Sequence, residues 1–167
     1  MAVDMFLKLT GIDGESADSK HKGEIEILSF SWGISSATRS ASSRLSAGRK
    51  ASLQDFSIVK YVDSSSPHLF VNSCEGSHIP EAHFTLRKAG ENQQEYYKVT
   101  LQDVLISSVS PGGSAGSGMP AMEQISFSFG AAEISAVGPD GRTTTRSTCG
   151  GSFEEDLPPV LVDGQKK

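Results

Sequence analysis

The feature that most constrains this fold is the two-residue period of its apolar side chains, which begins at the start of the chain. Apolar residues recur at Val3, Met5, Leu7 and Leu9, and the charged residues Asp4 and Lys8 stand between them. This alternation is typical of a β-strand with one buried face. The sequence therefore predicts that the chain enters a sheet almost at once.

A second predicted strand changes its apolar parity part of the way along. Ile25 and Ile27 share one face, whereas the opposite parity is taken by Leu28, Phe30, Trp32 and Ile34. A shift of one residue moves every following side chain to the other face of a sheet. The pattern predicts a β-bulge or a strand that bends around a barrel corner.

Further strands are predicted at residues 56–62, 82–88, 95–110 and 122–137, and the early part of the segment after residue 141 is expected to pair as another. In the second long strand, Val104 and Ile106 stand opposite in parity to Tyr97, Val99, Leu101 and Leu105. That division predicts a strand with both faces partly covered.

One helix is predicted. Ser66 is its expected N-cap and Pro67 its first residue, and Gly76 is expected to end it. Leu69, Phe70 and Cys74 are expected to face inward. The predicted fold class is mainly β, a single β-barrel or two-sheet sandwich with one short flanking α-helix. Residues 1–153 are expected to form one domain and residues 154–167 a loosely ordered tail.

Charge and composition exclude several functions. The 167 residues carry a net charge of -5, which argues against a nucleic-acid binder. One acid-free segment, residues 37–50, is basic and contains Arg39, Arg44, Arg49 and Lys50. It is either a docking site for an acidic partner or a solvated loop.

Targeting and redox signals are weak. The first ten residues lack the pattern of a signal peptide, and no apolar run is long enough to span a bilayer, which predicts a cytoplasmic, soluble protein without membrane insertion. Cys74 and Cys149 are too few for a disulfide framework and are interpreted as reduced.

No catalytic, cofactor or metal site is predicted, although three patterns partly resemble such sites. Between His78 and His83, only Glu81 and His83 share a strand face, and two ligands do not make a metal site. Ser114 matches a nucleophile elbow by letter, but it lies in a Gly/Ser turn between strands. Trp32 is favoured as a core or interface aromatic over a stacking platform.

Several segments, in order, resemble Hcp, the haemolysin-coregulated protein family of type VI secretion systems. The resemblance covers about residues 1–137 and includes M-A-V-D-M-F at 1–6, G-E-S at 14–16, S-W-G at 31–33, Q-D-F at 54–56, K-Y-V-D at 60–63, S-P at 66–67, R-K-A-G at 87–90 and V-L-I-S-S-V-S at 104–110. No single match is decisive, but their order and spacing are specific. The residues after about 137 do not follow the pattern.

The resemblance implies a structural protein and not an enzyme. Hcp-like proteins are β-barrels that form hexameric rings, and the rings stack into a tube that carries effectors in its lumen and is fired from the cell without a signal peptide. The implied partners are further copies of the chain, the sheath and spike proteins and the effectors. Ser31 would face the lumen, and the loop with Arg39, Arg44, Arg49 and Lys50 would contact the next ring.

Two other functions remain open from the residues. A monomeric β-sandwich could bind carbohydrate, with Trp32, Tyr61, Tyr96 or Tyr97 as stacking faces. A small hydrolase could use Ser114 with a histidine.

Overall fold

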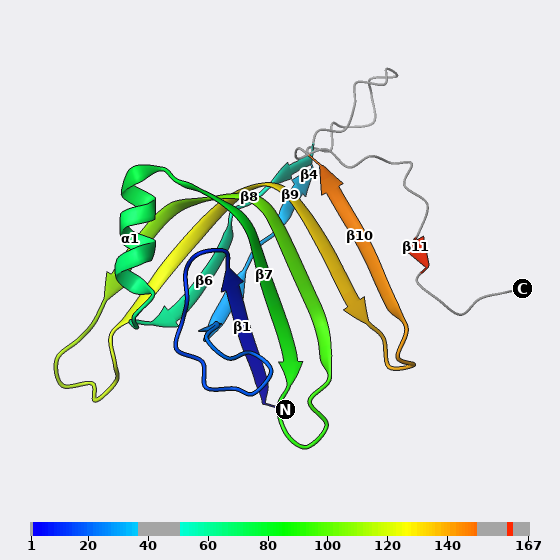
Figure 1. The fold of residues 1–167 in the computed structure, drawn as a ribbon, viewed down its shortest axis with the longest axis horizontal. Coiled ribbons are helices and arrows are strands. Elements are labelled where there is room, and N and C mark those ends of the chain that lie inside the picture. The colour runs from blue at the N-terminus through cyan, green and yellow to red at the C-terminus, as the bar shows by residue number, and fades with distance from the viewer. Residues whose placement is uncertain (1, 37–50, 150–159, 162–167) are drawn as a thin grey trace, which may run out of the picture.

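The computed structural model describes residues 2–36, 51–149 and 160–161 (Figure 1). Its helix is α1 (Ser66–Glu75), and its strands are β1 (Val3–Leu9), β2 (Ile25–Glu26), β3 (Ser29–Ser31), β4 (Ile34–Ser36), β5 (Ala51–Leu53), β6 (Phe56–Tyr61), β7 (His78–Lys88), β8 (Glu95–Gly112), β9 (Met122–Val137), β10 (Thr143–Cys149) and β11 (Val160–Leu161). The predicted fold class, mainly β with one short helix, is confirmed for the described residues.

Antiparallel pairing joins the long strands into one curled sheet (Figure 1). β1, β7, β8 and β9 are consecutive neighbours. β9 then has two further partners: residues 122–127 pair with β6, and residues 131–137 pair with β10. Because one strand serves different neighbours along its length, the sheet cannot stay flat and curls.

The segment 25–36 closes the curl by changing partners. β2 pairs with β1, β3 pairs with β6, and β4 pairs with β5. The Ile27 N–H donates to the Met5 carbonyl at 3.0 Å, and the next N–H, that of Leu28, donates to the Val59 carbonyl at 2.8 Å. The parity change predicted at this point is therefore a barrel corner, and the paired strands lead from β1 through this segment to β6 and back to β9.

The face predicted for Leu28, Phe30, Trp32 and Ile34 is only half right. Phe30 and Trp32 pack against the core. Leu28 and Ile34 are 40% and 44% exposed. Leu28 lies at the change of partner, before β3 begins, and Ile34 lies in the separate β4–β5 pair, so neither continues the inward face of Phe30 and Trp32.

In the three longest strands, the regular alternation of core-facing residues shifts by one position at a common level. Successive core residues are separated there by three positions instead of two, as in Ile79 and Ala82 of β7, Leu101 and Val104 of β8, and Phe129 and Ala132 of β9. The register brings Pro80, Asp103 and Gly130 to this level. Asp103 has a φ of 53°, and among the described residues it alone combines a positive φ with a side chain. The sheet is thus kinked along one line across β7, β8 and β9.

This kink overturns the predicted division of β8. Val99, Leu101, Val104 and Ile106 all lie in the same core cluster, and Leu105 does not share their face. A regular strand would have separated these residues, but the backbone turn at Asp103 returns them to one side. The expectation of a strand with two apolar faces is therefore wrong.

Helix α1 begins one residue earlier than predicted and buries less. Its N-cap is Ser65, Pro67 lies in its first turn, and Gly76 ends it with a φ of 64°, as expected. Leu69 is buried, but Phe70 is 54% exposed and Cys74 is also exposed. Those two residues lie about 100° and 140° around the helix axis from Leu69. Because the helix contacts the sheet only along a narrow strip of its surface, both side chains remain exposed.

A buried lysine joins helix α1 to the sheet. The Lys60 ammonium is fully buried and donates to Glu123 at 2.7 Å, to Asp63 at 2.8 Å and to the Tyr61 carbonyl at 2.8 Å. The hydroxyl of Ser66 donates to the same Glu123 carboxylate. Burial by itself raises the pKa of Asp63, but hydrogen bonds from Lys60 and Ser65 outweigh it and hold that pKa below its usual value. All three ammonium hydrogens thus have acceptors.

The C-terminal part adds strands to the open edge of β9. β10 pairs with β9 over its whole length, which confirms the strand expected there. Val160–Leu161 forms β11 and pairs with Thr144 and Thr145. The predicted domain boundary at 153/154 and the rest of the tail lie outside the described residues.

Replacing Lys60 tests the buried ion pair. Lys60→Met leaves the Glu123 carboxylate buried without a cation, and we expect it to lower the free energy of unfolding by about 3–5 kcal/mol. Lys60→Met with Glu123→Gln should recover part of the loss, and Lys8→Met, at an exposed position of β1, should change little. Denaturant titration at fixed protein concentration measures all three. A loss below about 1 kcal/mol for Lys60→Met would contradict the assignment.

Replacing Asp103 tests the kink. Asp103→Val places a β-branched residue at a positive φ, and we expect it to cost about 1–3 kcal/mol of stability. Asp103→Gly removes the same carboxylate but tolerates the backbone, so it should cost clearly less. Gln102→Val, one residue away, is the matched control. Thermal or denaturant unfolding in which the Val and Gly variants behave alike would rule out backbone strain as the cause.

Candidate functional site

Ser31 lies on the outer face of the sheet. It ends β3, and its two neighbours in sequence, Phe30 and Trp32, pack against the core. Because successive side chains of a strand point to opposite faces, the Ser31 hydroxyl points away from the core, and the residue is exposed. Ser31 and Trp32, adjacent in sequence, therefore face opposite sides of the sheet.

Ser31 is the first of four serines that lie side by side on neighbouring strands. The register pairs Ser31 with Ser57 of β6, Ser57 with Ser126 of β9, and Ser126 with Ser108 of β8. We call these four residues the serine row. The Ser57 and Ser126 hydroxyls are 2.9 Å apart and hydrogen-bonded to each other. Ser57 and Ser126 each lie between buried neighbours in their own strands, and the register places Ser31 and Ser108 beside them, so the four residues form one line across the outer face.

Uncharged side chains flank the serine row on one side, and a single carboxylate contacts the serines on its other side. The adjacent line of paired residues consists of Ser29, Val59, Gln124 and Ser110. On the other side, the Asp55 carboxylate accepts hydrogen bonds from Ser107 at 2.7 Å and from Ser128 at 3.2 Å. We call the serine row together with Ser29, Ser110 and Ser128 the serine face.

Chemically, the serine face can donate and accept hydrogen bonds but lacks the parts of a nucleophile site. A serine nucleophile needs a base beside its hydroxyl. Within the described residues, the recorded partners of these hydroxyls are other serines and Asp55, with no imidazole among them. The face is therefore suited to reversible contact with polar groups.

The serine row was missed from sequence apart from Ser31. Its signal was present as serine alternating with apolar residues in S-F-S at 29–31, F-S-I at 56–58 and I-S-F-S-F at 125–129. Alternation shows that each serine faces outward, but only the register shows that they meet.

The predicted ring-stacking residues Arg39, Arg44, Arg49 and Lys50 lie outside the described residues. The strands on either side of them are described: β4 pairs with β5 through Ile34 with Leu53 and Ser36 with Ala51. The basic segment therefore connects two paired strands.

The kink also changes the placement of the predicted histidine pair. Ile79 and Ala82 are buried, so His78, Glu81 and His83 all lie on the outer side, and the expectation that His78 points away from the other two is wrong. They do not converge, because His78 contacts Asp103 at 2.7 Å while His83 contacts Glu81 at 3.0 Å. In the described part of the chain, no three acidic, histidine or cysteine residues are placed to hold a metal ion.

Ser114 and Trp32 have ordinary surroundings. Ser114 is exposed in the turn between the antiparallel strands β8 and β9, where its hydroxyl donates to the Ala115 carbonyl, so the strand–helix context of a nucleophile elbow is missing. Trp32 packs edge-on against Phe56 and Phe129, with ring centroids 5.6 and 6.1 Å away. Its role as a core aromatic is confirmed.

Among the described residues, no helix has the length and apolarity to cross a bilayer.

Comparison with known proteins gives one consistent result. Residues 6–135 match the family model described as "Type VI secretion system effector, Hcp". Protein hcp1 of Pseudomonas aeruginosa is 44% identical over 117 residues, which are 70% of this chain and 72% of that protein. The crystal structure of Hcp1 from Salmonella typhimurium superposes with a TM-score of 0.75 at 38% identity, covering 89% of this chain and 95% of that one. A type VI secretion system effector from Yersinia pestis gives a TM-score of 0.72 at 32% identity, covering 87% and 99%.

The resemblance found in the sequence is thereby confirmed, and the curled β-sheet, its single described helix and the matched residues agree: the chain belongs to the Hcp family of type VI secretion proteins.

Proposed function

We propose that this chain forms hexameric rings that stack into the inner tube of a type VI secretion machine, and that the serine face lines the lumen and holds effectors. The observation that carries the proposal is the serine row, which runs across β3, β6, β9 and β8. It is a surface that an isolated barrel does not need for its own stability.

The chemistry of the serine face suits a lumen. A conduit must hold cargo in transit and then release it, so apolar or highly charged walls would bind too tightly or too selectively. Hydroxyls exchange protein contacts for water at a net value of only about 0.5–1.5 kcal/mol per hydrogen bond. Several weak hydrogen bonds to cargo would allow both retention and release. The Asp55 carboxylate beside the serine row already accepts hydrogen bonds from Ser107 and Ser128.

The contact between rings is proposed to involve the segment held between β4 and β5. Arg39, Arg44, Arg49 and Lys50 give it positive charge, while the chain as a whole carries -5. Opposite charges favour docking of the segment on an acidic surface of the next ring. Sheath and spike proteins would be the other partners, and the tube would leave the cell by being fired, without a signal peptide.

Carbohydrate binding by a monomer is less well supported. Its main candidate, Trp32, is half-buried and already packed on Phe56 and Phe129. A sugar platform requires an open aromatic face. Hydrolysis by Ser114 lacks both the base and the elbow geometry described above.

Ring formation is tested by imaging. Negative-stain electron microscopy should show closed rings with six-fold symmetry, and light scattering should give the mass of six chains. A heterologous interface closes only at a definite rotation, so open filaments or mixed sizes are not expected. Monomers alone at high concentration would refute the proposed assembly.

Cargo contact is tested by enlarging the serine row. Ser31→Gln and Ser126→Gln fill space at the row and displace its hydroxyls, and we expect each to weaken effector retention about three- to tenfold, which corresponds to the loss of one hydrogen bond. Ser73→Gln on helix α1 is the matched control. The readout is the amount of effector that copurifies with intact rings. Unchanged retention with rings present would remove the serine row from the proposal but leave the tube.

A further inference from the structure

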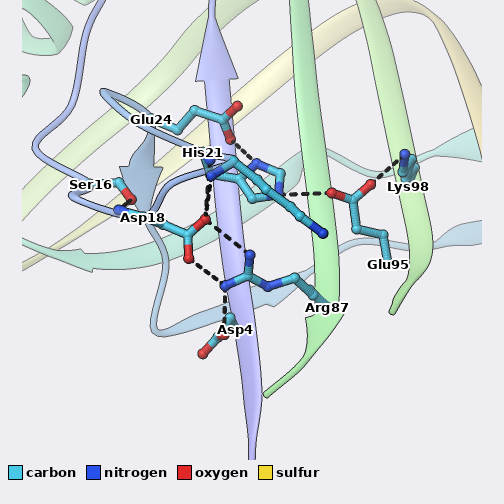
Figure 2. Close-up of polar contacts among 9 residues, drawn as sticks. Asp4, Ser16, Asp18, His21, Glu24, Arg87, Glu95 and Lys98 are labelled. Carbon is cyan, nitrogen blue, oxygen red and sulfur yellow. Dashed lines mark hydrogen bonds and ion pairs between the residues drawn. The ribbon is translucent and has the colours of Figure 1, made fainter. Parts of the chain in front are cut away.

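A loop that joins β1 to β2, residues 10–24, packs against the outer face of the sheet next to β1 and β7 (Figure 2). Beneath it, Phe6, Thr85 and Arg87 are buried although their strand neighbours face the core. The loop is also a small hairpin of its own, since the amides of Gly14 and Gly23 donate to the carbonyls of Gly23 and Ser16 at 2.8 and 2.9 Å. At its first residue, the Thr10 hydroxyl donates to the Glu81 carbonyl of β7 at 3.2 Å. Two groups of charged side chains attach the rest of the loop to the sheet.

The first attachment is Arg87 with Asp18. The guanidinium donates to both Asp18 oxygens, at 3.0 and 2.7 Å, and to Asp4 at 2.9 Å. Its carbon lies 4.9 Å from the centre of the Phe6 ring. The hydrogen bond from Arg87 holds the pKa of Asp18 well below its usual range, and the same contact raises the pKa of Arg87. Both partners of this attachment therefore stay charged through the neutral and mildly acidic range.

The second attachment is His21, which lies between two carboxylates. Its Nδ1 is 2.8 Å from Glu24, and its Nε2 is 2.9 Å from Glu95 of β8. The ring is stacked on Phe6 at 4.3 Å between centroids, with planes 8° apart, and the residue is only 6% exposed. Figure 2 shows Glu24 and Glu95 on opposite sides of the imidazole. Glu95 belongs to the sheet, so this contact fastens the loop to β8.

The protonation state follows from the partners. An ionised carboxylate only accepts hydrogen bonds, so both ring nitrogens must carry a proton to satisfy both contacts. That species is the imidazolium. A neutral imidazole has one N–H and leaves the other carboxylate facing a lone pair, so one of the two contacts must fail when the ring loses a proton.

The other charges around His21 decide which contact fails. Glu95 is also paired with Lys98. Burial alone raises the pKa of Glu95, but Lys98 and then His21 outweigh it, and the net pKa is below its usual value. Asp18 and Arg87 neutralise each other beside the ring, and Asp4 shares the guanidinium. When the ring is neutral, Glu95 still has Lys98 as its cation. Glu24 is three residues from His21 in the same loop, so the contact that fails is the one between His21 and Glu95.

We propose that His21 is a pH-dependent latch: its imidazolium fastens loop 10–24 to β8 through Glu95, and deprotonation of the ring releases that part of the loop while Arg87 and Asp18 keep the rest attached.

The sign of the pH dependence follows. The latch needs an ionised Glu95 and a protonated His21. The lowered pKa of Glu95 keeps its carboxylate ionised into mildly acidic solution, and its contribution is lost only as the pH falls through that lowered pKa. A rise in pH removes one of the two ring protons of an imidazolium. The loop is therefore fastened at mildly acidic pH and loosened at alkaline pH.

The protonation state is read directly by solid-state NMR of rings or monomers labelled with ¹⁵N at histidine. At pH 5.5 the His21 signal, assigned by its disappearance in His21→Gln, should show two protonated nitrogens, and at pH 8.5 only one. A neutral ring at pH 5.5 would overturn the proposal.

Loop release is read by hydrogen exchange of a peptide spanning residues 10–24, corrected for the intrinsic effect of pH. Protection of the Gly14, Ser16 and Gly23 amides should fall about tenfold from pH 5.5 to 8.5, as expected for losing a hydrogen bond to a charged group. His21→Gln should abolish this step, and His68→Gln on the exposed part of α1 should keep it. A step that persists in His21→Gln would overturn the proposal.

Glu95→Gln provides a second variant should His21→Gln fold poorly. It keeps an acceptor for one ring N–H but removes the charge that favours the imidazolium. The exchange step should shrink and move to lower pH. An unchanged step would mean that Glu95 is not the attachment point. None of these measurements depends on ring formation or on cargo.

Discussion

Two consecutive backbone amides hold this fold together. The N–H of Ile27 donates to Met5 of β1 and that of Leu28 to Val59 of β6, so two successive peptide units join strands that are not neighbours in the rest of the sheet. Every other strand pairing in the described residues could also form in a sheet that does not close on itself. The change of partner at this point curls the sheet and gives it an enclosed core and an outer face. The serine row depends on it, because Ser31 and Ser57 become neighbours only through the pairing of β3 with β6.

The kink at Pro80, Asp103 and Gly130 has a similar role along the strands. Long twisted strands tend to carry their side chains away from a compact core. One shift of parity at the same level in three strands keeps both halves of β8 and β9 on one core. The strain of a positive φ at Asp103 is confined to that line.

Polar contacts divide the outer surface into parts with different properties. Lys60 and Glu123 form a fully desolvated ion pair that fixes helix α1 to the sheet. This attachment is rigid because breaking the pair would leave a buried charge without a partner. The loop 10–24 is fastened by one permanent pair, Arg87 with Asp18, and one titratable contact, His21 with Glu95. The serine face carries neither kind of attachment. These three regions therefore differ in how firmly their side chains are held.

Local sequence determined the elements whose causes are local. Alternation placed β1, β6 and β9 nearly to the residue, Gly76 ended the helix, and the parity change at Ile27 and Leu28 marked the corner, because these follow from side-chain period and backbone preference. Ordered short motifs were enough to identify the Hcp family. Only the tertiary structure decided the rest. The identity of residue 103 does not by itself reveal its positive φ. His21 lies 74 residues from Glu95 in the sequence. The four serines of the row form one surface only when four strands are in register. Register and long-range pairing depend on how the whole chain closes on itself, and no local pattern encodes that.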